Sequence, residues 1–302
     1  MRKTPALLFL IVFFLSGFSH AQDIFRSPFS LLGPVGTPVY SDLKTAYKAG
    51  SACYKLHLEG ALADTHKIDQ KIAAISKLQV LKMESNGCEA LPEAFSQLNS
   101  LIFFSSRNNP LKSLPRGIEN WQTLMYLELN QCKFDSLPSD IAYLSKLKML
   151  NIQQNSSDTF RLPSSIAYLS ALKDILLYQV NLDSLPDNFG KLSQLENLTL
   201  INCRFSHIPG CIGKLKKLKI LELDMNRIQA FPREVCYLNQ LEYLSLRGNN
   251  ITLFRSNISR FPDEICFLTN LKTLDLRGNP VDPAQVEILK VLLPRGCKIL
   301  LQ

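Results

Sequence analysis

Histidine and cysteine are the residue types best suited to nucleophilic catalysis or metal binding, and their placement in this chain argues against both. Outside the N-terminal segment only His57, His66 and His207 occur, and they lie far apart in the sequence. This spacing supplies neither a histidine-rich metal site nor a Ser-His-Asp arrangement, and no phosphate-binding loop of the G-x-x-x-x-G-K type is present. The sequence therefore predicts a non-enzymatic protein with no catalytic residue, no cofactor and no metal ligand.

The eight cysteines also lack the spacing of a reactive or metal-binding motif. No C-x-x-C pair occurs among them, which removes the usual signature of zinc or dithiol chemistry. A composition of 46% hydrophobic and 20% charged residues is that of an ordinary globular chain. The cysteines therefore need a structural explanation.

The first 21 residues have the pattern of an export signal. Arg2 and Lys3 precede an apolar run over residues 6–18, and Ser19 and Ala21 form the small-x-small pattern that signal peptidase cleaves. The run is shorter than the roughly 18 residues of a membrane span. We expect cleavage after Ala21, no membrane span in the mature chain, and a secreted, periplasmic or cell-surface location; a retained anchor helix is the alternative.

A repeat of about 23 residues occupies most of the remaining chain. Its first half reads L-x-x-L-x-L-x-x-N, and its second half reads apolar-Pro-x-x-Ile-x-x-Leu, as in Leu137, Pro138, Ile141 and Leu144. A degenerate copy starts at Cys53 and brings the number of repeats to ten, over residues 53–281. The clear copies start at Leu78, Leu101, Leu124, Leu147, Leu172, Leu195, Leu218, Leu241 and Leu271.

This pattern resembles the leucine-rich-repeat family, in its 23-residue form with Leu-Pro in the second half. The resemblance implies an α/β solenoid with a curved parallel sheet on the concave face and short helical or 3-10 turns on the convex side. The residues agree with that fold, because strand alternation sends Leu221 and Leu223 to the interior and Glu222 to the opposite face. The spacing of three in the second half suits a single turn that returns the chain. By the same comparison Trp121, in the place of a core leucine, is expected to be buried.

Departures from the repeat pattern concern mainly the asparagine that ends its first half. Cys132, Cys203, Val180 and Ala61 take its place in four units. In this family a buried cysteine is a known substitute at that position, so we expect a structural role for both cysteines. Cys236 and Cys266 lie in adjacent units; free thiols are expected, with a bridge as the alternative.

The two ends are expected to cap the repeats. Residues 22–52 are predicted to form a loosely ordered lead to residue 40 and then a short helix, with Ser41 as its N-cap and Gly50 ending it. Residues 282–302 are predicted to form a C-terminal cap, with Asp282 as the N-cap of a helix and a further strand-like layer after it. Extracellular animal and plant members of the family usually carry cysteine-rich caps, which this chain lacks, so it is more similar to an exported bacterial member.

The formal charge of +8 does not lie on the predicted strands. Their outward positions hold nine basic and nine acidic residues, so the concave face is expected to be neutral. The excess positive charge belongs to the flanks and the convex side, as in Lys214, Lys216 and Lys217. Nucleic-acid binding by the sheet is therefore not expected.

The central strands carry the best candidate for a binding surface. Aromatic, aliphatic and neutral polar residues fill their outward positions, and charged residues precede and follow them, which is the composition of a protein interface. We expect a protein partner, with a surface adhesin or a glycan- or peptide-binding component as the alternative. An enzyme or an enzyme-regulating subunit that uses the loop from Asn250 to Ser256 is a weaker alternative, and the sequence does not determine the oligomeric state. The partner-binding residues expected are Phe103, Tyr126, Met149, Asn151, Gln153, Leu176, Tyr178, Thr199 and Ile201.

Overall fold

The computed structural model describes residues 32, 34, 36–60, 70–182, 184–252 and 261–301. The chain divides into two units, Met1–Leu32 and Gly33–Gln302, and the repeats lie in the second. The predicted signal peptide, His66, Ala61 and much of the loop from Asn250 to Ser256 lie outside the described residues. No helix among the described residues is long and apolar enough to span a membrane.

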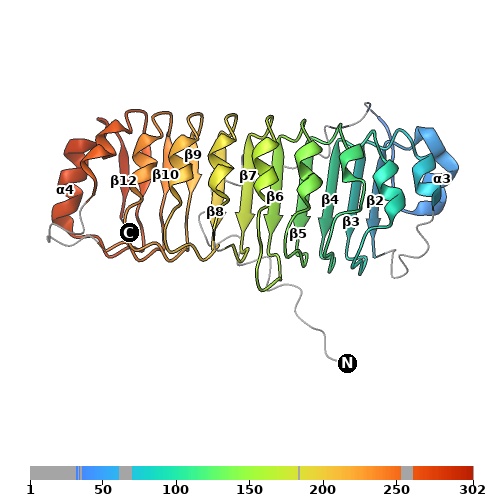
Figure 1. Cartoon of the computed structure of the whole chain (residues 1–302), viewed down its shortest axis with the longest axis horizontal. Coiled ribbons are helices and arrows are strands. Elements are labelled where there is room, and N and C mark those ends of the chain that lie inside the picture. The colour runs from blue at the N-terminus through green and yellow to red at the C-terminus, as the bar shows by residue number, and fades with distance from the viewer. Residues whose placement is uncertain are drawn as a thin grey trace, which may run out of the picture. The chain divides into compact units, whose positions relative to one another are not determined.

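Twelve parallel strands form one sheet in which every strand pairs with its neighbours in sequence (Figure 1). Ten strands come from the ten repeats, and β1 and β12 extend the sheet at its two ends. The strands are β1 (Val39–Tyr40), β2 (Lys55–Glu59), β3 (Val80–Glu84), β4 (Phe103–Arg107), β5 (Tyr126–Asn130), β6 (Met149–Gln153), β7 (Asp174–Tyr178), β8 (Asn197–Ile201), β9 (Ile220–Glu222), β10 (Tyr243–Ser245), β11 (Thr273–Asp275) and β12 (Lys298–Leu300).

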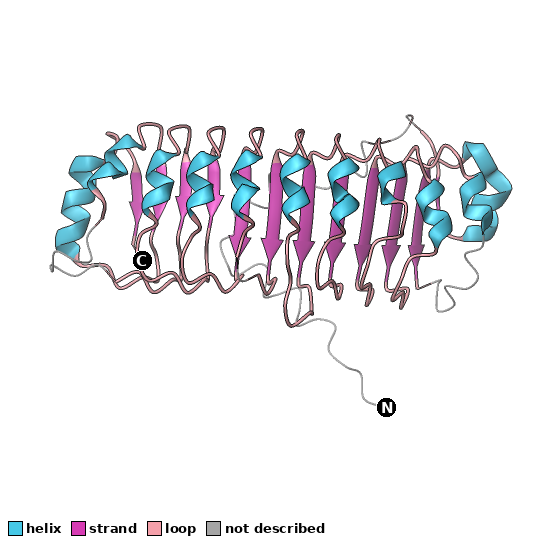
Figure 2. Ribbon diagram, in the orientation of Figure 1, coloured by secondary structure: helices cyan, strands magenta, loops and turns pink. Residues whose placement is uncertain are grey.

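Short 3-10 turns form a layer along one side of the sheet (Figure 2). Two α-helices flank the series, α3 (Leu43–Ala49) and α4 (Pro283–Leu292). The 3-10 turns are η2 (Gly50–Ala52), η4 (Gln70–Ala74), η5 (Glu93–Gln97), η6 (Ile118–Asn120), η7 (Ser139–Tyr143), η8 (Ser164–Tyr168), η9 (Asp187–Lys191), η10 (Gly210–Lys214), η11 (Arg233–Tyr237) and η12 (Asp263–Phe267).

Each repeat forms a strand and a turn because its apolar spacing changes from two to three. Leu221 and Leu223 are fully buried, as strand alternation requires. In the second half, proline sets the backbone before the turn, as at Pro138 with φ −66°, and the Leu144 N–H donates to the Ile141 carbonyl (3.0 Å) to close it. The predicted solenoid is confirmed.

The core fills the space between the strands and the turns. Trp121 is fully buried there, its Nε1 donates to the Phe95 carbonyl (2.8 Å), and its ring centroid lies 5.2 Å from that of Phe104. The buried indole therefore has a hydrogen-bond partner. The prediction that Trp121 belongs to the core is confirmed.

Buried asparagines join successive repeats below the strands. Asn226 Nδ2 donates to the Leu200 carbonyl of the preceding repeat (2.7 Å), and its Oδ1 accepts from the Cys203 N–H (3.0 Å). Cys203 itself directs its thiol at the carbonyls of Leu177 and Ile201, each at 3.4 Å. A thiol in this position thus reproduces the donor contacts of the amide to the preceding repeat. Cys132 likewise directs its thiol at the carbonyls of Ser106 (3.8 Å) and Asn130 (3.6 Å).

A left-handed residue ends each strand segment and turns the chain toward the asparagine position. The eighth residue of every repeat has a positive φ, from 51° at Asn108 to 70° at Gly278. Glycine suits this conformation best because it has no Cβ, yet most repeats use another residue. The non-glycine examples are Ser85, Asn108, Gln131, Gln154, Gln179, Asn202 and Met225.

The two caps differ from their predictions in detail. The N-cap of α3 is Asp42, whose carboxylate accepts from the Thr45 N–H (2.8 Å), so the assignment to Ser41 is wrong. Asp42 is the N-cap because it stands directly before Leu43, the first helical residue. Residues 39–40 form β1 and pair with β2, so the expected loose lead does not extend to residue 40. At the other end Asp282 caps α4 as predicted, accepting from the Ala284 N–H (2.8 Å).

Replacing Leu221 by alanine tests the strand register. Because Leu221 is fully buried, the change should leave a cavity and lower the unfolding free energy by about 2–5 kcal/mol. The exposed Lys146, replaced by alanine, should change it by less than about 0.5 kcal/mol. Denaturant unfolding followed by circular dichroism measures both, and equal effects would contradict the register.

Native thiol labelling tests the placement of the cysteines. Burial raises the pKa of Cys132, Cys203 and Cys236 to about 12 each, so these thiols should stay unreacted until the protein unfolds. Cys266 is exposed and should react in the native state. Labelling followed by peptide mass spectrometry reads each site. Rapid native reaction of Cys132 or Cys203 would contradict their buried positions, and a Cys236–Cys266 bridge in the unreduced protein would overturn the expected free thiols.

Candidate binding surface on the strand face

The strand face is the face of the sheet that is turned away from the 3-10 turns. Strand register brings all nine predicted binding residues together on it, over β4 to β8. The nine residues form three rows across adjacent strands, with three residues in each row. Strand β6 contributes one residue to every row. The rows are Phe103, Tyr126 and Met149; Asn151, Leu176 and Thr199; and Gln153, Tyr178 and Ile201.

These nine side chains differ in exposure. Tyr126, Gln153 and Tyr178 are partly exposed, and the other six are buried. Burial raises the pKa of the Tyr178 phenol. Phe103 is fully buried, with Lys82 Nζ 5.8 Å from its ring centroid, so it is expected to contribute to stability as well. The three partly exposed residues are therefore the ones best placed to contact a partner.

Hydrogen bonds fix the polar members of the rows. Gln153 Nε2 donates to Asn151 Oδ1 (3.0 Å) on the same strand, and Thr199 Oγ1 donates to Glu222 Oε2 (2.9 Å) on the next strand. A side chain held by such a bond loses less conformational freedom when a partner binds. The second bond also connects the rows to a carboxyl group beside them.

On the N-terminal side, the rows adjoin charged residues that contact one another. Glu84 lies 3.7 Å from Arg107 Nε and 3.8 Å from His57 Nε2. Glu128, in the middle row beside Asn151, is buried, and desolvation raises the pKa of its carboxyl although Ser105 donates a hydrogen bond to it. This side of the rows is therefore a mixed-charge border.

On the C-terminal side, the border is acidic and buried. Asp224 accepts from Ser245 Oγ and from the Arg247 N–H, and Asp275 forms a two-point ion pair with Arg277. Burial raises the pKa of Glu222 to about 7 and that of Asp224 to about 6, and Asp224 adds to the shift of Glu222 through charge repulsion. The strand pattern placed Glu222 on the outward face, and only the structure shows that this position is 4% exposed.

Other charges of the strand face neutralise one another between repeats. Glu196 accepts from both Lys173 and Lys219, each at 2.8 Å, which holds the pKa of its carboxyl at about 2. Lys272 pairs with Glu242 of the preceding repeat at 2.6 Å. These pairs agree with the equal numbers of acidic and basic residues in the outward positions of the strands.

The metal-ligating side chains of the described residues do not cluster. No group of three His, Cys, Asp or Glu side chains among them could hold a metal ion. His207 is exposed on a loop, with its Nδ1 3.0 Å from Ser206 Oγ, and His57 lies on β2 beside Glu84. The two described histidines therefore lie in separate parts of the solenoid.

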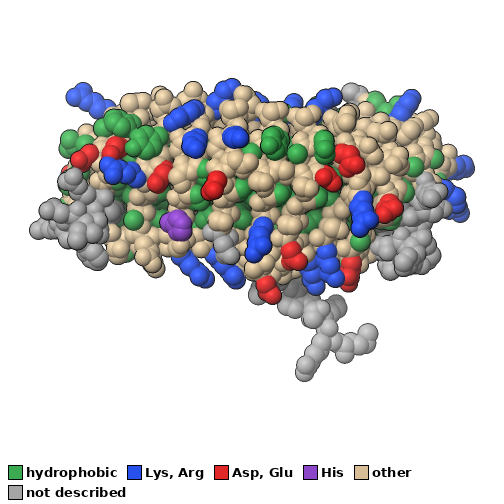
Figure 3. All heavy atoms as spheres, viewed as in Figure 1, with side chains coloured by type: hydrophobic (Ala, Val, Ile, Leu, Met, Phe, Trp, Pro, Cys, Tyr) green, Lys and Arg blue, Asp and Glu red, His purple; other side chains and the backbone are tan. Residues whose placement is uncertain are grey.

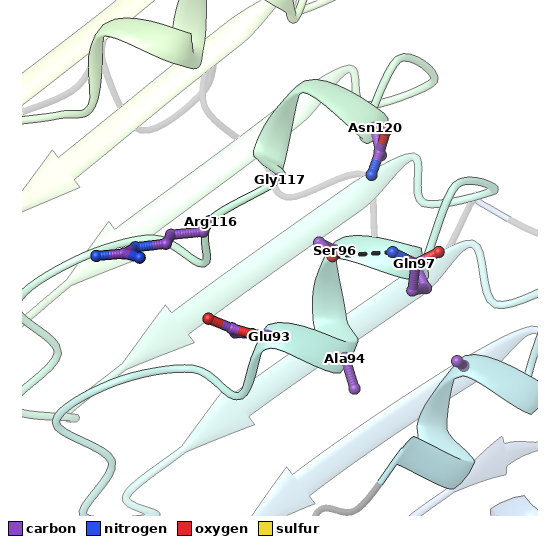
Figure 4. Close-up of a pocket in the computed structure, with 8 residues that line it drawn as sticks. Glu93, Ala94, Ser96, Gln97, Arg116, Gly117 and Asn120 are labelled. Carbon is purple, nitrogen blue, oxygen red and sulfur yellow. Dashed lines mark hydrogen bonds between the residues drawn. The ribbon is translucent and has the colours of Figure 1, made fainter.

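A hollow of about 600 Å³ lies on the side of the turns, between η5 and η6 (Figure 4). Glu93, Ser96, Gln97, Arg116 and Asn120 line it, and Gln97 Nε2 donates to Ser96 Oγ (3.2 Å). Its polar side chains include no nucleophile with an adjacent base. This hollow is therefore a weaker candidate for a functional site than the strand face.

The raised pKa values of Glu222 and Asp224 predict a pH dependence of stability. A carboxyl whose pKa is higher in the folded protein stabilises it most below the unfolded pKa, and this contribution is lost as the pH rises through the folded value. Unfolding free energy should therefore fall between about pH 4.5 and pH 7, by up to about 3 kcal/mol for Glu222. Other carboxyls, such as Glu196, act in the opposite direction.

The contribution of the acidic pair is isolated by comparing variants. Relative to the wild type, the double variant Glu222→Gln/Asp224→Asn should gain stability as the pH rises from 4.5 to 7.5, as measured by denaturant unfolding. Asp187→Asn, at an exposed turn, serves as the control and should leave the pH profile unchanged. A difference that is constant with pH would show that the pair is ionised throughout.

Comparisons with known proteins identify the repeat. The description "Leucine-rich repeat region" matches residues 116–226, and "Leucine rich repeat" matches residues 217–281. No curated protein matches the sequence significantly.

Solved structures share the fold at low sequence identity. The crystal structure of a TDR receptor has a TM-score of 0.64 and 24% identity, with coverage of 88% of this chain and 46% of that one. The plant peptide hormone receptor RGFR1 in complex with RGF2 has a TM-score of 0.53 and 21% identity, with coverage of 87% of this chain and 49% of the receptor. The chain thus spans about half the length of these two receptors. The leucine-rich repeat domain of the type III effector XopL has a TM-score of 0.56 and 21% identity, with coverage of 85% of this chain and 88% of that domain.

The two family matches together run from residue 116 to residue 281, which is more than half of the 302-residue chain. The twelve parallel strands and their 3-10 turns have the architecture of the solved leucine-rich-repeat domain of XopL. On its repeats and its fold, this chain belongs to the leucine-rich-repeat family.

Proposed function

We propose that this protein is an exported, non-enzymatic recognition protein that binds a partner protein through its strand face. The observation that carries the proposal is the set of three short uncharged rows on β4 to β8, each of three residues, with charged residues such as Glu128 and Asp174 in register beside them. Interfaces place aromatic and neutral residues at the centre and charges at the rim. Export is inferred from the basic N-terminus and apolar run of residues 1–21.

The fold supports recognition as the general role. Leucine-rich-repeat proteins are generally recognition scaffolds, and the plant receptor RGFR1, which shares the fold, is described in complex with RGF2. A rigid sheet that presents one residue per strand in every row can contact a partner without rearranging. A protein segment that spans several strands is therefore the partner that fits this surface.

Truncation of the partly exposed tyrosines tests this proposal. Tyr126→Ala and Tyr178→Ala should each weaken partner binding by about 1–3 kcal/mol, as expected of aromatic anchors at the centre of an interface. The partner is first recovered from surface and culture extracts with the wild-type protein and identified by mass spectrometry. Isothermal titration calorimetry with that purified partner then measures the affinities.

The matched control is a pair of tyrosines on the turns. Tyr143 and Tyr168 are 60% and 66% exposed, and alanine at both removes the same chemical groups from another surface. These two changes should leave affinity for the protein partner unaltered. If they reduce affinity more than Tyr126→Ala and Tyr178→Ala do, the binding surface is not the strand face.

A further inference from the structure

The turn-to-strand edge is a second surface with a distinct composition. For each of the nine 3-10 turns η4 to η12, we define it as the last residue of the turn and the three residues that follow, up to the first leucine of the next repeat. Among these 36 positions there are six lysines and no aspartate, glutamate or arginine. All six lysines are exposed: Lys77, Lys146, Lys191, Lys214, Lys216 and Lys217. The nine segments are residues 74–77, 97–100, 120–123, 143–146, 168–171, 191–194, 214–217, 237–240 and 267–270.

The lysines of this edge are not neutralised by carboxylates of the described chain. Lys217 Nζ donates to Gln194 Oε1 (2.7 Å), and Lys216 Nζ donates to the carbonyls of Gly213 (2.8 Å) and Tyr237 (3.0 Å). None of the six takes part in an ion pair within the described residues, whereas Lys173, Lys219 and Lys272 on the strand side all do. The charge of the edge is therefore available to an external anion.

Figure 3 shows the same contrast between the two edges of the solenoid. Blue side chains lie along the upper edge, where the strands begin. Along the lower edge, where the strands end, red and blue side chains lie together on the right, and blue side chains lie alone farther left. On the lower edge Lys112 pairs with Glu89 (2.7 Å). Both edges carry basic side chains, and the turn-to-strand edge differs in having no acidic residue among its defined positions.

The most exposed aromatic side chains of the described chain lie on this same edge. Tyr143, Tyr168, Tyr237 and Phe267 are each the last residue of a 3-10 turn and are between 47% and 66% exposed. The aromatic residues end η7, η8, η11 and η12, and Lys191 and Lys214 end the two turns between them, η9 and η10. Because successive repeats stack in register, equivalent positions form a line of aromatic and ammonium groups.

We propose that the turn-to-strand edge binds the surface of a bilayer that contains anionic phospholipids. Tyrosine and phenylalanine locate at the boundary between headgroups and acyl chains, and lysines on flexible stems are attracted to anionic headgroups around them. The absence of arginine from the edge favours a diffuse anionic surface over recognition of a single phosphate, for which a planar guanidinium is better suited. This binding is independent of the strand face, which stays open to a protein partner.

Vesicle sedimentation with the full chain tests the proposal. Vesicles of phosphatidylcholine, with or without phosphatidylglycerol, are compared at low and physiological salt. The readout is the difference between the two lipid compositions, because the apolar run at residues 6–18 can partition into either. The wild type should prefer anionic vesicles, and the preference should weaken as salt is added.

Two triple variants with the same loss of charge separate edge binding from net charge. Lys191→Gln/Lys214→Gln/Lys217→Gln should reduce binding to anionic vesicles on the order of a hundredfold at low salt, at about fivefold for each lysine. Lys133→Gln/Arg204→Gln/Arg227→Gln removes three exposed basic residues from the opposite edge and should cost less than about threefold. All six side chains are exposed, so thermal melts should be unchanged.

The aromatic contribution is tested separately. Tyr143→Ser/Tyr168→Ser should weaken binding to anionic vesicles several-fold while the salt dependence is retained, since the lysines remain. Equal losses in the two triple variants, or no preference of the wild type for anionic vesicles, would overturn the proposal. Tighter binding to soluble DNA or inorganic polyphosphate than to vesicles, lost in the same lysine variant, would also overturn it and assign the edge to a soluble polyanion.

Discussion

No single repeat of this chain can bury its own leucines, and the rest of the structure depends on that constraint. Each strand and turn covers one side of the next, so burial is complete only when the repeats stack in register. The turns approach so closely that a Cβ at Gly190 would lie 2.5 Å from the Cys211 carbonyl oxygen. The residue before the last position of each turn is accordingly small in most repeats, as at Gly213 and Ala167. Close stacking thereby determines which side chains can reach the surface.

Stacking in register converts repeat positions into lines on the surface. On the strand face the lines bring uncharged residues from five strands into one area, and between repeats they place Glu196 within reach of two lysines. On the turn-to-strand edge they align lysines that form no ion pair with any residue that the structure describes. A solenoid can in this way keep two surfaces of different chemistry apart, because each surface uses different positions of the repeat. The proposed protein-binding and membrane-binding surfaces differ for this reason.

The asparagine positions show how the fold tolerates substitution. Asn226 joins its neighbour repeat through both a donor and an acceptor, whereas Cys203 supplies only the donor contacts. The thiol fits because it can donate weakly to the two carbonyls that it faces, and burial raises its pKa to about 12 so that it stays protonated. The same burial would penalise a charged side chain there.

The sequence by itself determined the repeat, its register and the position of the core, because leucines at fixed spacing admit only one way of being buried together. It also determined which outward positions are uncharged, since strand alternation is a local property, and it located Trp121 in the core. Only the tertiary structure decided which of those outward residues are covered. Tyr126 is partly exposed and Phe103 is fully buried, although both are the third residue of their repeats. The same holds for Glu222 and Asp224, whose raised pKa values come from burial and from neighbouring carboxyls on the sheet. Exposure and pKa depend on the neighbours across repeats, and those distances exist only once the chain has folded.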